Sequence, residues 1–160
     1  RNAAIATIWD PVAVTHCFVA GEGAIVPLRF GGKSAPNCGD PYDAMVTVKR
    51  LVRDAHQSFG TMPVAMGDSA VIEVDGVEVI LNSERSQAFE RTVFSAMGID
   101  PMRKDILVVK STNHFYADFS KFASDVIYCE AGRPYPNRAQ LTPYKKAPRN
   151  IWPIVENPFA

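Results

Sequence analysis

The dipeptide Asp75-Gly76 constrains the fold of this chain more than any other feature, because it separates two runs of alternating apolar and polar residues. The runs are VIEV at 71–74 and VEVIL at 77–81. Asp-Gly tolerates the positive φ angles that a tight hairpin turn needs, so we predict an antiparallel pair of strands here. Residues 44–51 alternate in the same way and predict a half-buried strand.

The first residues of the chain form a nearly continuous apolar run, AAIATIW at 3–9. Such a run is typical of a strand that is buried on both faces in a parallel sheet. Asp10 can then cap a helix that begins at Pro11 and ends at Gly21. Since a buried strand seldom opens a complete gene product, we expect an N-terminal part to be missing from this chain.

The last third of the chain predicts helices between short strands. Apolar residues at helical spacing predict helices at 87–97 and 113–122. Short apolar runs predict buried strands at 105–110 and 125–129, on either side of the second helix. This strand–helix–strand order implies a parallel crossover.

These patterns together predict an α/β fold with a mixed sheet, parallel strand–helix–strand units, a central antiparallel hairpin and an extended Pro-rich C-terminal tail. The 160 residues suit one domain, and a chain of this size buries roughly 70 % of its unfolded surface. We assign residues 1–132 to this domain and residues 133–160 to the tail. The tail is expected to pack its rings on the domain and to leave its charges in water.

Charge and cysteine content limit the partners and the compartment. Seventeen Lys and Arg balance seventeen Asp and Glu, so no basic face for a nucleic acid is expected. No apolar run reaches the ~20 residues that cross a bilayer, so no membrane partner is predicted. Three cysteines without a CxxC pair fit reduced thiols and a cytoplasmic location. The three histidines lack zinc-ligand spacing, so we predict no metal site in this chain.

The stretch Gly31-Gly32-Lys33 is the first candidate for binding an anion. Two glycines bring backbone N–H groups close to an anion, and Lys33 adds a positive charge. The alternative is a tight turn with a solvated lysine.

Residues 110–114, KSTNH, form the second candidate, because they follow a predicted strand and open a predicted helix. Ligands of open α/β sheets bind at the carboxyl ends of strands, and a helix N-terminus attracts anions. Lys110, Asn113 and His114 could reach such a site. The alternative is that Ser111 only caps the helix and that His114 packs.

Two further polar groups have a functional and a structural interpretation. Gly67-Asp68-Ser69 either forms a bulge that directs a side chain at a site or is a turn with local hydrogen bonds. Asp40 and Asp43 either act as an acid and a base or are solvated loop residues.

Short motifs along nearly the whole chain follow one another in an order that is typical of one family. They are Asp10-Pro11, Phe30-Gly31-Gly32-Lys33, Gly39-Asp40-Pro41, Gly67-Asp68-Ser69-Ala70-Val71, Asn82-Ser83-Glu84-Arg85-Ser86-Gln87, Gly98-Ile99-Asp100-Pro101, Val109-Lys110-Ser111, His114-Phe115, and Tyr144 with Ile151-Trp152-Pro153. This series resembles the C-terminal domain of the MlrC-like proteins, which are named after the zinc metallopeptidase that degrades linearised microcystin. One departure is Tyr116, which stands close to where the family has an arginine.

The resemblance implies that this chain is the domain that shapes the substrate cleft of a zinc-dependent metallohydrolase acting on peptide or amide bonds. It further implies that zinc is held by a larger N-terminal domain of the parent protein and that this chain binds none. The implied partners are that N-terminal domain and a small peptide or amide substrate, with a homo-oligomer as a further expectation.

The candidate site combines these expectations. By hypothesis, His114 is catalytic, and Lys33, Lys110, Ser111 and Asn113 hold an anionic group such as a substrate carboxylate or a developing oxyanion. Alone, the chain is predicted to be inactive, since no nucleophile–base pair is evident. The alternatives are a non-catalytic module that binds an anion or small molecule, and a domain that supports dimerisation through its tail.

Overall fold

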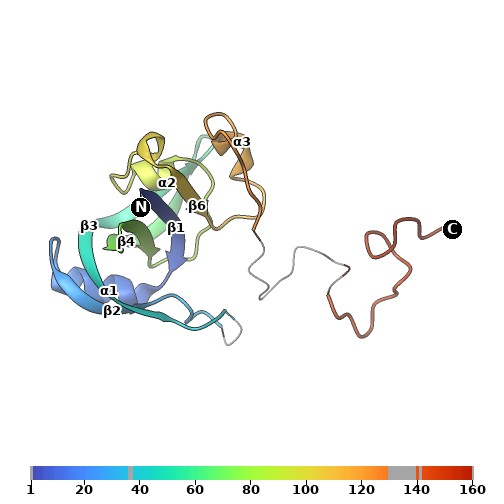
Figure 1. The fold of residues 1–160 in the computed structure, drawn as a ribbon, viewed down its shortest axis with the longest axis horizontal. Coiled ribbons are helices and arrows are strands. Elements are labelled where there is room, and N and C mark those ends of the chain that lie inside the picture. The colour runs from blue at the N-terminus through green and yellow to red at the C-terminus, as the bar shows by residue number, and fades with distance from the viewer. Residues whose placement is uncertain (1, 36–37, 130–139, 141, 160) are drawn as a thin grey trace.

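The computed structural model describes residues 2–35, 38–129, 140 and 142–159, and its centre is one six-stranded sheet (Figure 1). The spatial order of the strands is β2-β3-β4-β5-β1-β6. The strands are β1 (Ala3–Trp9), β2 (Ile25–Phe30), β3 (Tyr42–Phe59), β4 (Met62–Val74), β5 (Val77–Asn82) and β6 (Ile106–Val109), and the helices are α1 (Pro11–Ala20), α2 (Thr92–Ser95), the 3-10 helix η1 (Pro101–Arg103) and α3 (Tyr116–Phe119). Strand β1 runs parallel to β5 and β6, while the other pairs are antiparallel, which confirms the predicted mixed sheet.

The N-terminal strand and helix lie where the sequence predicts them. Asp10 caps α1, because its Oδ1 accepts a hydrogen bond of 3.0 Å from the backbone N–H of Ala13. Pro11 takes the first helical position, and Gly21, with a φ of 86°, follows the last turn.

The hairpin around Asp75-Gly76 is also confirmed. Val74 pairs with Val77, and the two turn residues have φ angles of 51° and 76°, as a type I′ turn requires. Strands β3 and β4 are longer than predicted, and β4 runs through Gly67, where its pairing with β3 shifts register between Val52 and His56. Beyond the end of β5 the two strands project as a hairpin of residues 53–68, which we call the β3–β4 arm.

Helices cover both faces of the sheet and enclose two apolar clusters (Figure 1). On one face, Ala13, Val14 and Cys17 of α1 pack against side chains of β2 to β5. On the other face, α2 and α3 contribute Phe94 and Phe119. Both clusters are almost wholly apolar, so burial of this area is the main stabilising contribution.

The predicted helices of the last third are far shorter than expected. The helix predicted at 87–97 is limited to α2, and the helix predicted at 113–122 is limited to α3. Residues 83–89 have no regular secondary structure instead, because they form hydrogen bonds with Thr7 of β1, Gln57 of β3 and Lys110 that a helix would not allow. Helix propensity is a weak preference that such tertiary contacts override.

The predicted strand at 125–129 is absent, so the parallel crossover between 105–110 and 125–129 is wrong. The parallel partner of β6 is β1, which comes from the opposite end of the chain.

The tail is described only in part, since residues 130–139, 141 and 160 lie outside the described residues. Residues 142–159 form turns and bends. One hydrogen bond of 3.4 Å joins Arg149 Nη1 to the carbonyl of Thr142. The packing of the tail on the domain stays a prediction. Within the described part of the chain, no helix combines the length and apolarity that crossing a bilayer would take.

Candidate functional site at the carboxyl edge of the parallel strands

The carboxyl ends of β5, β1 and β6 lie side by side and are joined by hydrogen bonds. The backbone N–H of Asp10 donates to the carbonyl of Asn82 (3.0 Å), and that of Lys110 donates to Ala6 (2.7 Å). We call this region, residues 6–10, 82–88 and 109–111, the carboxyl edge. It is the end of an α/β sheet at which ligands bind.

A segment without regular secondary structure, residues 83–88, crosses the carboxyl edge from the end of β5 toward the end of β6. The hydroxyl of Thr7 donates to the carbonyl of Ser86 at 2.8 Å, and the N–H of Ala88 donates to the carbonyl of Lys110 at 3.3 Å. The segment therefore brings Arg85 to the ends of the parallel strands.

Buried polar side chains gather at this edge. Among the described residues, the side chains classed as both polar and buried are those of Thr7, Asp10, Gln57, Ser69, Asn82 and Ser86. Asn82 Oδ1 has no hydrogen-bond partner in the described part of the chain, while its amide donates to the carbonyl of Glu84. Since buried polar groups cost stability unless they are satisfied, this concentration marks the edge as more than a packing surface.

Lys33 lies at this edge in an ion pair with the buried carboxylate of Asp10. Lys33 Nζ is 2.8 Å from Asp10 Oδ2 and 2.6 Å from the carbonyl of Arg29. The N–H of Gly31 donates to the same carboxylate oxygen at 3.0 Å. Two of the three ammonium donors are thus used within the domain, and the lysine of this turn is paired rather than solvated.

Lys110, by contrast, has a second cation for a neighbour. Partial burial of the ammonium lowers the pKa of Lys110 below its ordinary value, the guanidinium of Arg85 lowers it further, and Cys38 partly opposes the shift. No carboxylate of the described residues forms an ion pair with Lys110. Within the described part of the chain, Lys110 and its neighbour Arg85 therefore bring positive charge to this edge without a carboxylate partner.

Residues 111–114 do not open a helix, because α3 begins at Tyr116 and the preceding Phe115 provides no side-chain cap. The predicted helix N-terminus at these residues is therefore wrong. The hydroxyl of Ser111 donates to Gln87 Oε1 at 3.1 Å, and the side chain of Asn113 is exposed.

His114 lies in a small ring cluster beside the carboxyl edge. Its imidazole is 5.4 Å from the ring of Phe59 and 5.7 Å from the ring of Phe89, which are 4.8 Å apart. His114 is exposed, and among the described residues no carboxylate orients its ring. The structure thus brings Lys110 and Ser111 together with Arg85, while His114 lies at the aromatic border of the site.

Sequence reasoning missed Gln57, which holds the β3–β4 arm against the carboxyl edge. Gln57 is 2 % exposed, and its amide donates to the hydroxyl of Ser86 (2.9 Å) and the carbonyl of Gln87 (2.7 Å). Its Oε1 accepts from the N–H of Phe89 at 3.0 Å. Nothing in the pattern around Gln57 indicates these contacts, whereas Arg85 stands inside the quoted motif 82–87.

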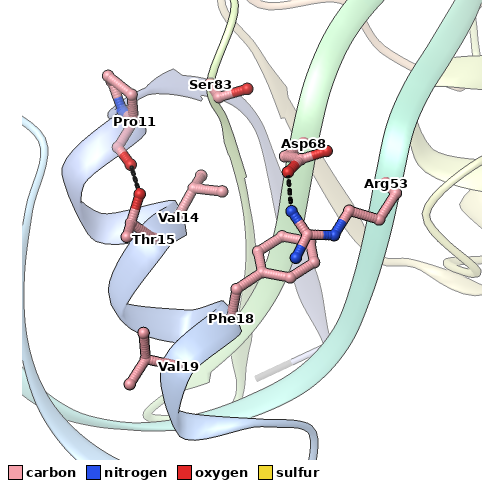
Figure 2. Close-up of a pocket in the computed structure, with 8 residues that line it drawn as sticks. All are labelled: Pro11, Val14, Thr15, Phe18, Val19, Arg53, Asp68 and Ser83. Atoms are coloured by element: carbon pink, nitrogen blue, oxygen red, sulfur yellow. Dashed lines mark hydrogen bonds and ion pairs between the residues drawn. The ribbon is translucent and has the colours of Figure 1, made fainter.

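A pocket of about 330 Å³ lies between α1 and the β3–β4 arm and reaches the carboxyl edge at Ser83 (Figure 2). Figure 2 shows Arg53 across the ring of Phe18, with its guanidinium directed at Asp68; the guanidinium carbon is 4.1 Å from the ring centroid. The N–H of Asp54 and then the guanidinium of Arg53 hold the pKa of Asp68 below its usual range. Because these charges compensate one another, the pocket is a weaker candidate than the carboxyl edge.

The remaining acidic candidates, Asp40 and Asp43, lie at the surface of the domain. Asp43 accepts both Nε (2.8 Å) and Nη2 (2.7 Å) of Arg29, and Asp40 is exposed. Within residues 2–35, 38–129, 140 and 142–159, no three His, Cys, Asp or Glu side chains come together as a metal site would need. The described residues thus do not fit a metal centre.

Comparison with known proteins settles the family. The family model for the MlrC C-terminus matches residues 1–146. This chain belongs to the MlrC C-terminus family. It is 30 % identical over 150 residues to microcystinase C of Sphingomonas sp.. The aligned region covers 94 % of this chain and 29 % of that relative.

A solved structure has the same fold as this MlrC C-terminal domain. It is a protein of Mesorhizobium sp. BNC1 that is described provisionally as a metallopeptidase, with a TM-score of 0.70 and 26 % identity. The match covers 76 % of this chain and 25 % of that chain. The domain therefore spans less than a third of the length of either relative, and the predicted family is confirmed.

Proposed function

We propose that this MlrC C-terminal domain forms one wall of the substrate cleft in a larger metallohydrolase that cleaves peptide or amide bonds. The names of the two relatives, microcystinase and metallopeptidase, support this reaction class. The proposed metal is zinc, held by ligands in the part of the larger protein outside this domain, as the family resemblance implies. Any bound metal would supply Lewis-acid chemistry, while this domain binds and orients the substrate.

The uncompensated cations at the carboxyl edge carry this proposal. Lys110 and Arg85 are close enough to influence each other's charge, and no described carboxylate pairs with Lys110. A substrate carboxylate or a developing oxyanion placed there would relieve this repulsion. Donors and cations that are already in position stabilise such a charge without reorganisation.

The other residues of the candidate site have narrower proposed roles. Lys33 has one ammonium donor left after its bonds to Asp10 and Arg29. Ser111 would turn its hydroxyl from Gln87 to the anion, and Asn113 would donate from its exposed amide. His114, exposed beside Phe59 and Phe89, would hydrogen-bond to the reacting group of the substrate.

The test is kinetic and uses the complete protein that contains this domain, assayed against a panel of linear peptides. We expect Lys110→Ala and Arg85→Ala each to lower kcat/KM by on the order of 10²-fold, because each removes part of the proposed anion site. His114→Ala should also lower kcat/KM. The matched control is Lys49→Ala, since Lys49 pairs with Glu73 (3.2 Å) at the surface of the antiparallel strands.

The pH dependence adds a second readout. Lys110 carries its charge only below its pKa, which burial and Arg85 lower. We therefore expect kcat/KM to fall as the pH rises through that pKa, and the fall to be absent in Lys110→Ala. Unchanged kcat/KM in both Lys110→Ala and His114→Ala would remove the proposed site, and a complete protein without hydrolase activity would remove the proposed reaction.

A further inference from the structure

One face of strand β6 is apolar and open to solvent. Ile106 is 60 % exposed and Val108 is 47 % exposed, although the strand reads ILVV. Among the described residues β6 is the last strand of the sheet, with β1 on its only paired side. A run of this kind is typical of a strand with both faces buried, which is what the sequence predicts for it.

The exposure of β6 is confined to the face of the sheet that carries α1. Leu107 and Val109 point to the other face and pack against the cluster under α2 and α3. Ile106 and Val108 therefore share the α1 face with Ile5, which pairs with Val108 in the parallel ladder. Helix α1 makes its main contacts with β2 to β5.

Parallel strands are almost always covered on both faces, because the helices that connect them lie on those faces. Among the described residues, β6 is covered on one face only, by the cluster under α2 and α3, while on the α1 face Ile5 and Ile8 of the neighbouring β1 reach the edge of the α1 cluster. Ile106, Val108 and the half-buried Ile5, which we call the β1–β6 face, thus form an incomplete core layer rather than a solvated surface.

We propose that the β1–β6 face is the surface on which the remaining part of the larger protein packs onto this domain. This inference rests on the proposed function, which places the domain in a larger hydrolase. The domain spans 29 % of microcystinase C and 25 % of the solved relative, so most of each of those chains lies outside it and is long enough to supply a cover. The cover is an apolar helix or strand that completes the parallel layer.

The experiment compares lysine substitutions in the complete protein. Ile106→Lys and Val108→Lys leave the domain itself unstrained, since both side chains are already exposed in it. The matched control is Ile25→Lys, at a 69 % exposed isoleucine on the opposite edge strand β2. If the face is covered, a buried lysine should lower Tm by on the order of 5 °C or more. Limited proteolysis should then release a fragment of the size of this domain, while Ile25→Lys behaves as the unchanged protein.

Hydrogen exchange of the unchanged complete protein provides a measurement that needs no variant. A covered and paired β6 should exchange its amides at least about tenfold more slowly than an exposed edge strand such as β2. Rapid exchange at 106–109, or unchanged Tm and proteolysis in both lysine variants, would overturn the inference. Conversion of a dimer to a monomer at unchanged Tm would also overturn it, because the cover would then be a second copy.

The outcomes for interface and function can be separated. An active complete protein whose lysine variants are unaffected would refute the interface alone. A complete protein without hydrolase activity whose lysine variants lose stability would refute the proposed reaction and leave the interface in place.

Discussion

The two halves of the sheet differ in how they are assembled and in what they bury. The antiparallel half, β2 to β5, links strands that follow one another in the chain, and the ion pairs Arg29–Asp43 and Lys49–Glu73 on it are exposed. The parallel half, β5, β1 and β6, joins segments that are far apart in the chain. Among the described residues, its carboxyl edge holds four of the six buried polar side chains, including that of Asp10 in its ion pair with Lys33, while Gln57 and Ser69 lie on β3 and β4.

This difference shows where a site can be built in such a fold. A tight hairpin pairs its backbone N–H and C=O groups within a few residues of one another and leaves none of them unpaired. Where distant segments meet at strand ends, loops bring charges and hydrogen-bond donors together, and burial strengthens their interactions. Each of the following substitutions tests whether the polar edge, rather than the antiparallel half, is the sensitive region.

The largest effect is expected for Asp10→Ala. The substitution leaves Lys33 beside an empty position, removes the cap of α1 and deprives the N–H of Gly31 of its acceptor. Breaking one side of a buried pair costs about 3–5 kcal/mol of unfolding free energy. Urea unfolding measures this loss. The control is Asp43→Ala, whose exposed pair with Arg29 is not expected to matter; equal losses in both variants would contradict the comparison.

A smaller effect is expected for Gln57→Ala, which releases the β3–β4 arm from the carboxyl edge. Three hydrogen bonds to residues 86, 87 and 89 disappear and leave buried groups unpaired, at a cost of about 1–3 kcal/mol. Hydrogen exchange of Phe89 should accelerate. Ser58→Ala is the control, since its hydroxyl has no hydrogen bond within the described residues; protection of Phe89 in Gln57→Ala would argue against this anchor.

The next effect is a pH dependence of stability that Asp118 causes under the parallel half of the sheet. The hydrogen bonds from Arg91 hold the pKa of Asp118 below its ordinary value of 3.8. Its contribution is complete above about pH 5 and is lost as the pH falls through the lowered pKa. The Tm of Asp118→Asn should therefore fall less steeply than the Tm of the unchanged protein when the pH is lowered from 6 to about 3. Identical pH profiles would show that the pair adds nothing.

The smallest effect is expected for Arg29→Ala on the antiparallel half. Arg29 and Asp43 are both largely exposed, so solvent screens their attraction. We expect Tm to stay within experimental error at low and at high salt. A clear loss that salt abolishes would mean that surface charge on this half also matters.

Comparison of particular elements shows how far the sequence alone reaches. The hairpin at Asp75-Gly76 and the start of α1 were predictable, because each depends on residues within one turn of each other. The predicted helix at 87–97 fails because Gln57 and Thr7 bind residues 86–89 in a non-helical form. No local pattern carries that information.

The candidate site divides in the same way. Lys33, Lys110 and Ser111 were found as charged or polar residues after predicted strands, and they do lie near strand ends. Their partners were not found, because Asp10, Arg85 and Gln87 reach them across large separations in the chain. Among the described residues, Lys33 is consequently paired with a carboxylate and Lys110 is not, although both look alike in the sequence.

The sequence by itself determined the family, the capped first helix and the type I′ hairpin, because motifs and turn conformations are local properties of the chain. The tertiary structure decided the parallel order β5-β1-β6, the non-helical path of residues 83–89 and which charged side chains lie next to one another. These depend on burial and on hydrogen bonds between distant segments, whose free energy exceeds local propensity.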